Sequence, residues 1–162
     1  MLVPAIRAAG YENLVVASPD TGAIKNTHLW AKHLKVPMVL AAKNRLNAEE
    51  VEVTSVIGDV EGKTVLLVDD LTETFGTLAT AAGEFLSRGA RRAIAAVSHA
   101  PLLPKGISRL TESPIECLYT TDTVLVPEHP KIRKCSMAGI IGGAIWRIHA
   151  NESVSSLFEV RD

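Results

Sequence analysis

Short hydrophobic runs recur along the chain, and most of them contain few polar interruptions. Nearly continuous apolar runs are typical of strands that are covered on both faces, as in a parallel sheet. The strands predicted in this way span residues 14–17, 36–42, 64–69, 93–98 and 117–121.

A helical spacing of apolar positions separates several of these runs. In residues 77–88 the apolar side chains form one stripe, and Gly89 follows as a stop signal. Residues 25–34 and 137–149 show similar spacing. Because alternating strands and helices indicate βαβ units, we expect one α/β domain over residues 1–162, with a largely parallel five-stranded core sheet flanked by helices.

Two kinds of segment interrupt this alternation. Residues 49–60 alternate only in part and end near Gly58, which predicts an extended excursion that closes in a turn. Four prolines are expected to mark loops within the domain, namely Pro101, Pro104, Pro127 and Pro130.

Composition narrows the class of protein. Of 162 residues, 47% are apolar and 22% charged, and the net charge is −1, which excludes a disordered or charge-dominated chain. With only 4% aromatic residues and no basic excess, no nucleic-acid partner is expected. The chain lacks a long apolar window and a secretory signal, so we expect a cytoplasmic protein without a membrane span. Cys117 and Cys135 are expected to be reduced, buried thiols.

The segment from residue 64 to residue 77 carries the strongest chemical signal. An apolar strand runs into Asp69 and Asp70, and a hydroxyl-rich loop with Thr74, Gly76 and Thr77 leads into a helix. Helix N-termini bind phosphate through unpaired N–H groups, and carboxylates accept hydrogen bonds from sugar hydroxyls or hold Mg²⁺. The pattern therefore favours a phosphosugar site. In the simpler alternative, the acids only end a strand and Thr74 only caps a helix.

The same segment resembles a known family. The sequence VLLVDDLTETFGT resembles the phosphoribosyl-diphosphate motif of type I phosphoribosyltransferases and ribose-phosphate diphosphokinases. The segments NLVVASPDTGAIK, AAKNR followed by VEVTSVIGDVEGK, TDTVLVP and ESVSSLF resemble the diphosphokinases in particular. The resemblance extends from Asn13 to Phe158 and implies a type I phosphoribosyltransferase-like fold.

The resemblance also implies an activity and a phosphosugar site. Members of this family transfer the diphosphoryl group of MgATP to the 1-hydroxyl of ribose 5-phosphate. By similarity, Asp69 and Asp70 face the ribose hydroxyls, and Asp20 lies near Mg²⁺. The 5-phosphate is held by Glu73, Thr74, Phe75, Gly76 and Thr77.

Further roles follow from other parts of the resemblance. Lys43 and Arg45 match the basic residues of a catalytic loop that closes over the transferring phosphates. Asn47 belongs to the same polar segment. Ser153 and Ser155 match a segment that helps to bind regulatory anions between subunits.

The chain departs from the family pattern in residue type and in length. Glu73 replaces an aspartate, Ala23 replaces a glycine, and Phe75 is bulkier than the usual residue. The resemblance covers only the second half of a diphosphokinase, so much of the ATP site is expected on another segment or polypeptide. We therefore expect a homo-oligomer or a partner with the missing half. The alternatives are an inactive regulatory relative and a phosphoribosyltransferase that acts on a base.

Overall fold

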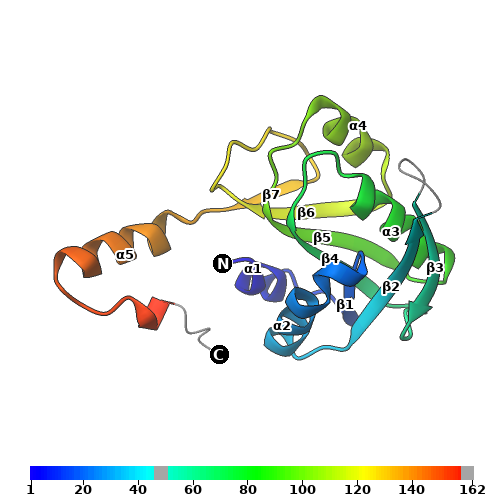
Figure 1. Ribbon diagram of the computed structural model, residues 1–162, viewed down its shortest axis with the longest axis horizontal. Coiled ribbons are helices and arrows are strands. Elements are labelled where there is room, and N and C mark those ends of the chain that lie inside the picture. The colour runs from blue at the N-terminus through cyan, green and yellow to red at the C-terminus, as the bar shows by residue number, and fades with distance from the viewer. Residues whose placement is uncertain (46–50, 158–162) are drawn as a thin grey trace.

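A single sheet organises the computed structural model, which describes residues 1–45 and 51–157 (Figure 1). Its strand order is β3-β2-β1-β4-β5-β6-β7. The strands are β1 (Leu14–Ser18), β2 (Met38–Arg45), β3 (Val51–Ile57), β4 (Thr64–Leu71), β5 (Arg92–His99), β6 (Ile115–Thr121) and β7 (Ile132–Cys135).

The five strands predicted from apolar runs are all present, as β1, β2, β4, β5 and β6, and they pair with one another in parallel. The described part of the sheet also contains two strands that were not predicted as such. The excursion expected over residues 49–60 contains β3, which pairs antiparallel with β2, and β7 extends the opposite edge in parallel. The expected α/β fold is therefore confirmed, with a sheet of seven strands instead of five.

Helices cover both faces of this sheet. One face carries α1 (Leu2–Ala8) and α2 (Ile24–Leu34), and the other carries α3 (Gly76–Ser87) and α4 (Pro104–Glu112). In β4 all residues from Thr64 to Val68 are buried because successive side chains enter the two cores in turn. This double coverage explains why the strand sequences are almost continuously apolar.

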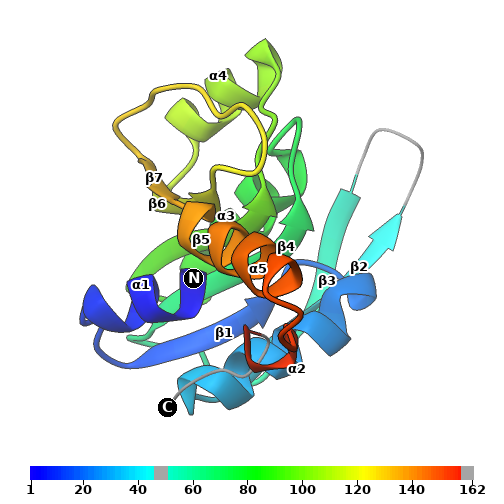
Figure 2. The same ribbon diagram turned by 90° about the vertical axis from the view of Figure 1, so that its left-hand side faces the viewer.

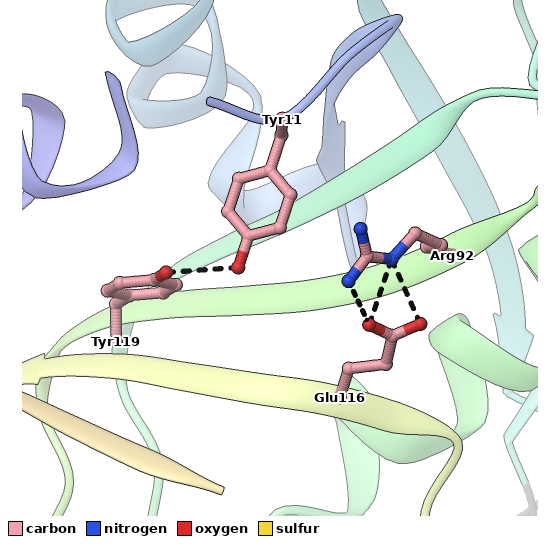
Figure 3. A network of polar contacts seen from close by, with 4 residues as sticks. All are labelled: Tyr11, Arg92, Glu116 and Tyr119. Atoms are coloured by element: carbon pink, nitrogen blue, oxygen red, sulfur yellow. Dashed lines mark hydrogen bonds and ion pairs between the residues drawn. The ribbon is translucent and has the colours of Figure 1, made fainter. Parts of the chain in front are cut away.

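The N-terminal segment is fastened to the sheet by a polar network (Figure 3). The Tyr11 and Tyr119 hydroxyl groups lie 3.0 Å apart, and their rings meet edge to face at 6.4 Å. Arg92 forms an ion pair with Glu116 and lies 5.4 Å from the centre of the Tyr11 ring. These contacts connect the segment after α1 to β5 and β6.

The last long helix, α5 (Ala138–His149), does not pack as its apolar stripe predicts. It contains no buried residue, and it projects away from the sheet before the short 3₁₀ helix η2 (Ser155–Leu157) (Figures 1 and 2). Among the exposed side chains on α5 are Ile145, Trp146 and Ile148. Contiguous apolar surface of this kind is uncommon on monomeric proteins.

Two smaller predictions are wrong. Pro104 does not mark a loop but occupies the first turn of α4, where its missing N–H costs nothing. Cys117 and Cys135 are free thiols but only half-buried, because β7 is the edge strand of the sheet and β6 lies next to it. Within the described ranges, no helix has the length and apolar character needed to cross a membrane.

Candidate functional site

The candidate site lies where the connections of the sheet reverse direction. From β1 the chain passes to β2 on one side, whereas β4, its other neighbour, leads to β5 and β6 on the opposite side. Ligands of open α/β sheets bind outside the carboxyl ends of the strands at such a switch point. Asp20 follows β1, and Asp69 and Asp70 end β4, so the topology brings the predicted acids to this point.

The loop between β4 and α3 forms a small cavity at this edge. The cavity has a volume of about 150 Å³ and is lined by Asp69 and residues 71–78. All five residues predicted to hold the 5-phosphate therefore line this cavity. Asp70 is exposed next to Asp69, whereas the side chain of Phe75 is 1% exposed and packs in the core. Only the backbone of Phe75 is therefore available to a ligand.

The beginning of α3 keeps its backbone donors available. Phe75 is the N-cap residue, with φ of 58°, and no side chain caps the helix. Thr74 therefore does not act as the helix cap that the simpler interpretation requires. The first N–H groups of a helix lack intrahelical partners and lie at the positive end of the helix dipole. This arrangement suits a phosphate group.

The acidic pair has an unusual electrostatic environment. Burial raises the pKa of Asp69 to about 6, and the nearby charges of Asp70 and Asp20 act in the same direction. The Asp70 backbone N–H donates to the Asp69 carboxylate at 2.9 Å and opposes this shift. The three carboxylates of Asp20, Asp69 and Asp70, at the carboxyl ends of β1 and β4, thus favour binding of a cation or of a hydrogen-bond donor from a ligand.

The residues present suit Mg²⁺ shared with a ligand better than a cage made by the protein alone. Within residues 1–45 and 51–157, no group of three or more His, Cys, Asp or Glu side chains is arranged to hold a metal ion. Mg²⁺ is commonly held by one or two carboxylates together with substrate phosphates. Asp20 and Asp69 provide hard oxygen donors of this kind. Burial and the charges of Asp70 and Asp20 raise the pKa of Asp69, and a cation there would offset both.

Asp20 also shapes the turn after β1. Its carboxylate accepts hydrogen bonds from Gly22 N at 3.0 Å and Ala23 N at 3.1 Å, and so caps the short 3₁₀ helix η1 (Thr21–Ala23). Ala23 has φ of −87°. Alanine adopts this conformation readily, so the replacement of glycine at this position introduces no backbone strain.

The predicted basic loop begins as a strand in the structure. The backbone of Lys43 lies opposite Val53, and that of Arg45 lies opposite Val51, in the hairpin of β2 and β3. A register shift occurs between Ala42 and Lys43. β2 runs parallel to β1 and continues beyond Leu40, the partner of Ser18, so its end extends past the carboxyl edge. Asn47 lies outside the described residues.

The structure does not bring the two C-terminal serines to this edge. The Ser153 carbonyl accepts a hydrogen bond from Arg147 at 3.1 Å, and its hydroxyl oxygen accepts one from Ser155 N at 3.2 Å. Both serines follow α5, which stands apart from the sheet (Figure 1). They form a separate surface segment.

The sequence pattern did not reveal the contribution of α4. Gly106 and Arg109 on this helix lie against the loop after β4. Pro104 at the first turn of a helix was the available signal for α4. No local pattern signals the contact between Arg109 and Thr74, because 35 positions separate them.

Comparison with solved structures agrees with this architecture. Phosphoribosylpyrophosphate synthetase from Mycobacterium smegmatis matches with a TM-score of 0.82 and 30% identity, over 93% of this chain and 50% of that one. A hypoxanthine phosphoribosyltransferase from Staphylococcus aureus matches with a TM-score of 0.52 and 14% identity, over 84% of this chain and 69% of its own. The second match shows the common fold alone.

Sequence comparison finds relatives of higher identity than these two solved structures. A ribose-phosphate pyrophosphokinase from Gloeobacter violaceus is 40% identical in an alignment of 162 residues, which covers 98% of this chain and 49% of that relative. One from Caldanaerobacter subterraneus is 43% identical in an alignment of 150 residues, which covers 91% of this chain and 48% of that relative. The chain thus spans about half the length of these relatives, whose name denotes a transferase.

A family model connects these similarities to most of the chain. The model of the phosphoribosyl synthetase-associated domain matches residues 36–159, which include the acidic pair, the phosphate loop and α4. The resemblance to ribose-phosphate diphosphokinases is therefore confirmed, and the chain belongs to the phosphoribosyl synthetase-associated domain family.

Proposed function

We propose that this chain binds ribose 5-phosphate, or the phosphoribosyl diphosphate made from it, as part of a ribose-phosphate diphosphokinase. The observation that carries the proposal is the cavity of about 150 Å³ at the switch point of the sheet. The start of α3, with its uncapped N–H groups, and Asp69 both line this cavity. A phosphate at one end and hydroxyl groups at the other match this pairing of donors and acceptors.

In the complete enzyme the reaction transfers a diphosphoryl group. The 1-hydroxyl oxygen of the sugar bonds to the β-phosphorus of ATP, and the bond from that phosphorus to the oxygen shared with the α-phosphorus breaks. AMP leaves, and the hydroxyl proton passes to solvent. Such a transfer depends mainly on position and on compensation of negative charge.

The acidic and loop residues bind and orient the sugar in this proposal. The backbone N–H groups and hydroxyls of residues 73–77 hold the 5-phosphate, while Asp69 and Asp70 accept hydrogen bonds from ribose hydroxyls. Asp20 and Asp69 would hold Mg²⁺ together with the phosphates of the ligands. Mg²⁺, when bound, offsets the negative charge of those phosphates.

Lys43 and Arg45 act on the transferring group. We assign them to the charge that develops on the diphosphoryl group, because lysine supplies a compact cation and arginine a planar fork for phosphate oxygens. The extension of β2 beyond the carboxyl end of β1 supports this assignment, since it directs the backbone past the edge that carries the acids.

We also propose that another polypeptide packs on α5 in the assembled protein. The exposed apolar side chains of this helix support a homo-oligomer or a partner that carries the remaining half of the relatives' length. Ser153 and Ser155 lie next to the same helix, so regulatory anions that bind there would meet this interface.

Calorimetry in Mg²⁺ buffer tests the proposed function. Ribose 5-phosphate and phosphoribosyl diphosphate are expected to bind the chain more tightly than ATP, because the phosphate loop lies within the chain and much of the adenine pocket is proposed to lie outside it. Ribose without the phosphate is the matched control ligand and is expected to bind weakly. Tight ATP binding without phosphosugar binding would overturn the proposal.

A further inference from the structure

The first turn of α4 packs against the backbone of the loop that follows β4. Leu103 N donates a hydrogen bond of 3.0 Å to the Glu73 carbonyl oxygen. A Cβ atom placed on Gly106 would lie 2.3 Å from the same oxygen. The helix therefore approaches the loop as closely as glycine permits, and it holds the Glu73 carbonyl toward itself.

Arg109 holds the next carbonyl of the loop. Its Nη1 atom donates a hydrogen bond of 3.3 Å to the Thr74 carbonyl oxygen. A Cβ atom on Gly76 would lie 2.7 Å from the same nitrogen, so the guanidinium group occupies space that a side chain at position 76 would need. Two successive carbonyls of the loop are thus bound by one helix.

These two contacts determine where the N–H groups of the loop point. A trans peptide is planar, and the N–H of each residue points opposite to the carbonyl of the residue before it. With the Glu73 and Thr74 carbonyls held toward α4, the N–H groups of Thr74 and Phe75 point away from α4. Phe75 has φ of 58°, a left-handed conformation that commonly contributes to anion-binding concavities of successive N–H groups.

The charge of Arg109 remains available to the loop. No ion pair between residues of the described ranges involves Arg109. Its half-buried guanidinium group therefore interacts with the Thr74 carbonyl as a charged donor, and such bonds are stronger than neutral ones.

We propose that Arg109 is a positioning residue that fixes the phosphate-binding loop, with Gly106 as the close contact that lets α4 reach it. The bond to the Thr74 carbonyl orients the Phe75 N–H toward the phosphate of a phosphosugar. This inference rests on the proposed function, because it assigns the orientation of the donors that the phosphate would meet.

Arg109→Met removes the donor and the charge but keeps the length of the side chain, and Arg109→Lys keeps the charge without the fork. The matched control is Arg88→Met, which breaks only an exposed ion pair with Glu84 at the other end of α3. Amide NMR spectra of the free 162-residue chain report the conformation of the loop, and calorimetry measures the affinity for ribose 5-phosphate.

Arg109→Met is expected to weaken ribose 5-phosphate binding about tenfold, as for loss of one charged hydrogen bond. It is also expected to shift the Thr74 and Phe75 amide resonances of the free chain. Arg109→Lys should recover part of the affinity, and Arg88→Met should change neither measurement. Unchanged affinity in Arg109→Met would overturn the inference, and so would unchanged resonances.

A wild-type chain that fails to bind ribose 5-phosphate would reject the proposed function, while the resonances of the free chain would still decide whether Arg109 holds the loop. Gly106→Ala provides a second variant if Arg109→Met does not fold. Its added methyl group must displace the Glu73 carbonyl, whereas Gly83→Ala on exposed α3 surface meets no atom within 4 Å and serves as its control. Equal affinity in these two alanine variants would also contradict the inference.

Discussion

The backbone N–H of Asp70 donates a hydrogen bond of 2.9 Å to the carboxylate of Asp69, its neighbour at the end of β4. This bond favours the ionised carboxylate, but burial outweighs it, and the charges of Asp70 and Asp20 add to burial. The pKa of Asp69 rises from 3.8 to about 6 as a result. Ionisation of this carboxyl group is thus less favourable in the folded chain than in water, and a cation or a ligand donor beside it would offset that cost.

The first prediction concerns stability and pH. Because the folded pKa of Asp69 exceeds its unfolded value, the folded chain binds the proton more tightly, and this contribution to stability is lost as the pH rises from 3.8 toward and through about 6. Asp69→Asn removes the charge, so it should raise the free energy of unfolding at pH 7.5 by about 1 kcal/mol, after allowance for solvent screening of a half-exposed group.

Urea unfolding between pH 4 and pH 8 measures this effect. The control is Asp59→Asn, because the pKa of Asp59 is lowered by its bond to Lys63, and loss of that charge should not increase stability at neutral pH. The same decline in stability above pH 4 in wild type and Asp69→Asn would contradict the assignment of the titration to Asp69.

The second prediction concerns Phe75, which combines a left-handed backbone with a buried ring. Phe75→Ala should lower the free energy of unfolding by about 3–5 kcal/mol, as for other large core truncations. Phe75→Leu keeps most of the buried volume and should cost about 1.5 kcal/mol or less. Urea unfolding compares the two variants. Equal stability losses would contradict the assignment of this contribution to packing of the ring.

Sequence pattern predicted the central sheet because strands buried on both faces carry continuous apolar runs. Leu66 and Leu67, for example, enter opposite cores from adjacent positions of β4. The edge strands carry a weaker signal. In β7 the residues Arg133 and Lys134 are exposed, so this short strand has no apolar run to reveal it.

The site was predictable only in part for a similar reason. Asp69, Thr74 and Gly76 are close in sequence, so a local motif describes them, and the parallel pairing of β1 and β4 brings Asp20 to the same edge. The bond from Arg109 to Thr74 depends on how α4 packs after the sheet has formed. Exposure of α5 likewise depends on tertiary packing, because its apolar spacing equals that of a helix that packs on the sheet.

The third prediction concerns self-association through α5. Trp146 is 61% exposed, and Ile145 and Ile148 are exposed on the same helix, so the 162-residue chain is expected to associate at high concentration. Ile145→Lys should weaken association roughly tenfold or more, because a buried side chain of this size contributes about 1.5–3 kcal/mol. Sedimentation equilibrium measures the dissociation constants.

Leu125→Lys is the matched control for the charge added to α5, since Leu125 is an exposed leucine in the segment before β7. This substitution should leave the dissociation constant unchanged. A wild-type chain that stays monomeric at high concentration would exclude self-association through α5, and equal effects of the two substitutions would place the contact elsewhere.

The last prediction separates catalysis from binding at Lys43. The chain alone is expected to show little diphosphokinase activity, whereas a complete enzyme, with the polypeptide that supplies the remaining half, should show it. There, Lys43→Ala should lower kcat by about tenfold or more while the KM for ribose 5-phosphate changes little, because the lysine charge is proposed to act on the transferring phosphates. The sugar phosphate is proposed to bind the loop of residues 73–77, which Lys43→Ala leaves intact. Lys63→Ala provides the control. This lysine pairs with Asp59 just before β4, at the amino-terminal end of that strand, whereas the acids lie at its carboxyl end. An unchanged kcat in Lys43→Ala would remove this residue from the catalytic role, and a large rise in KM alone would assign it to sugar binding instead.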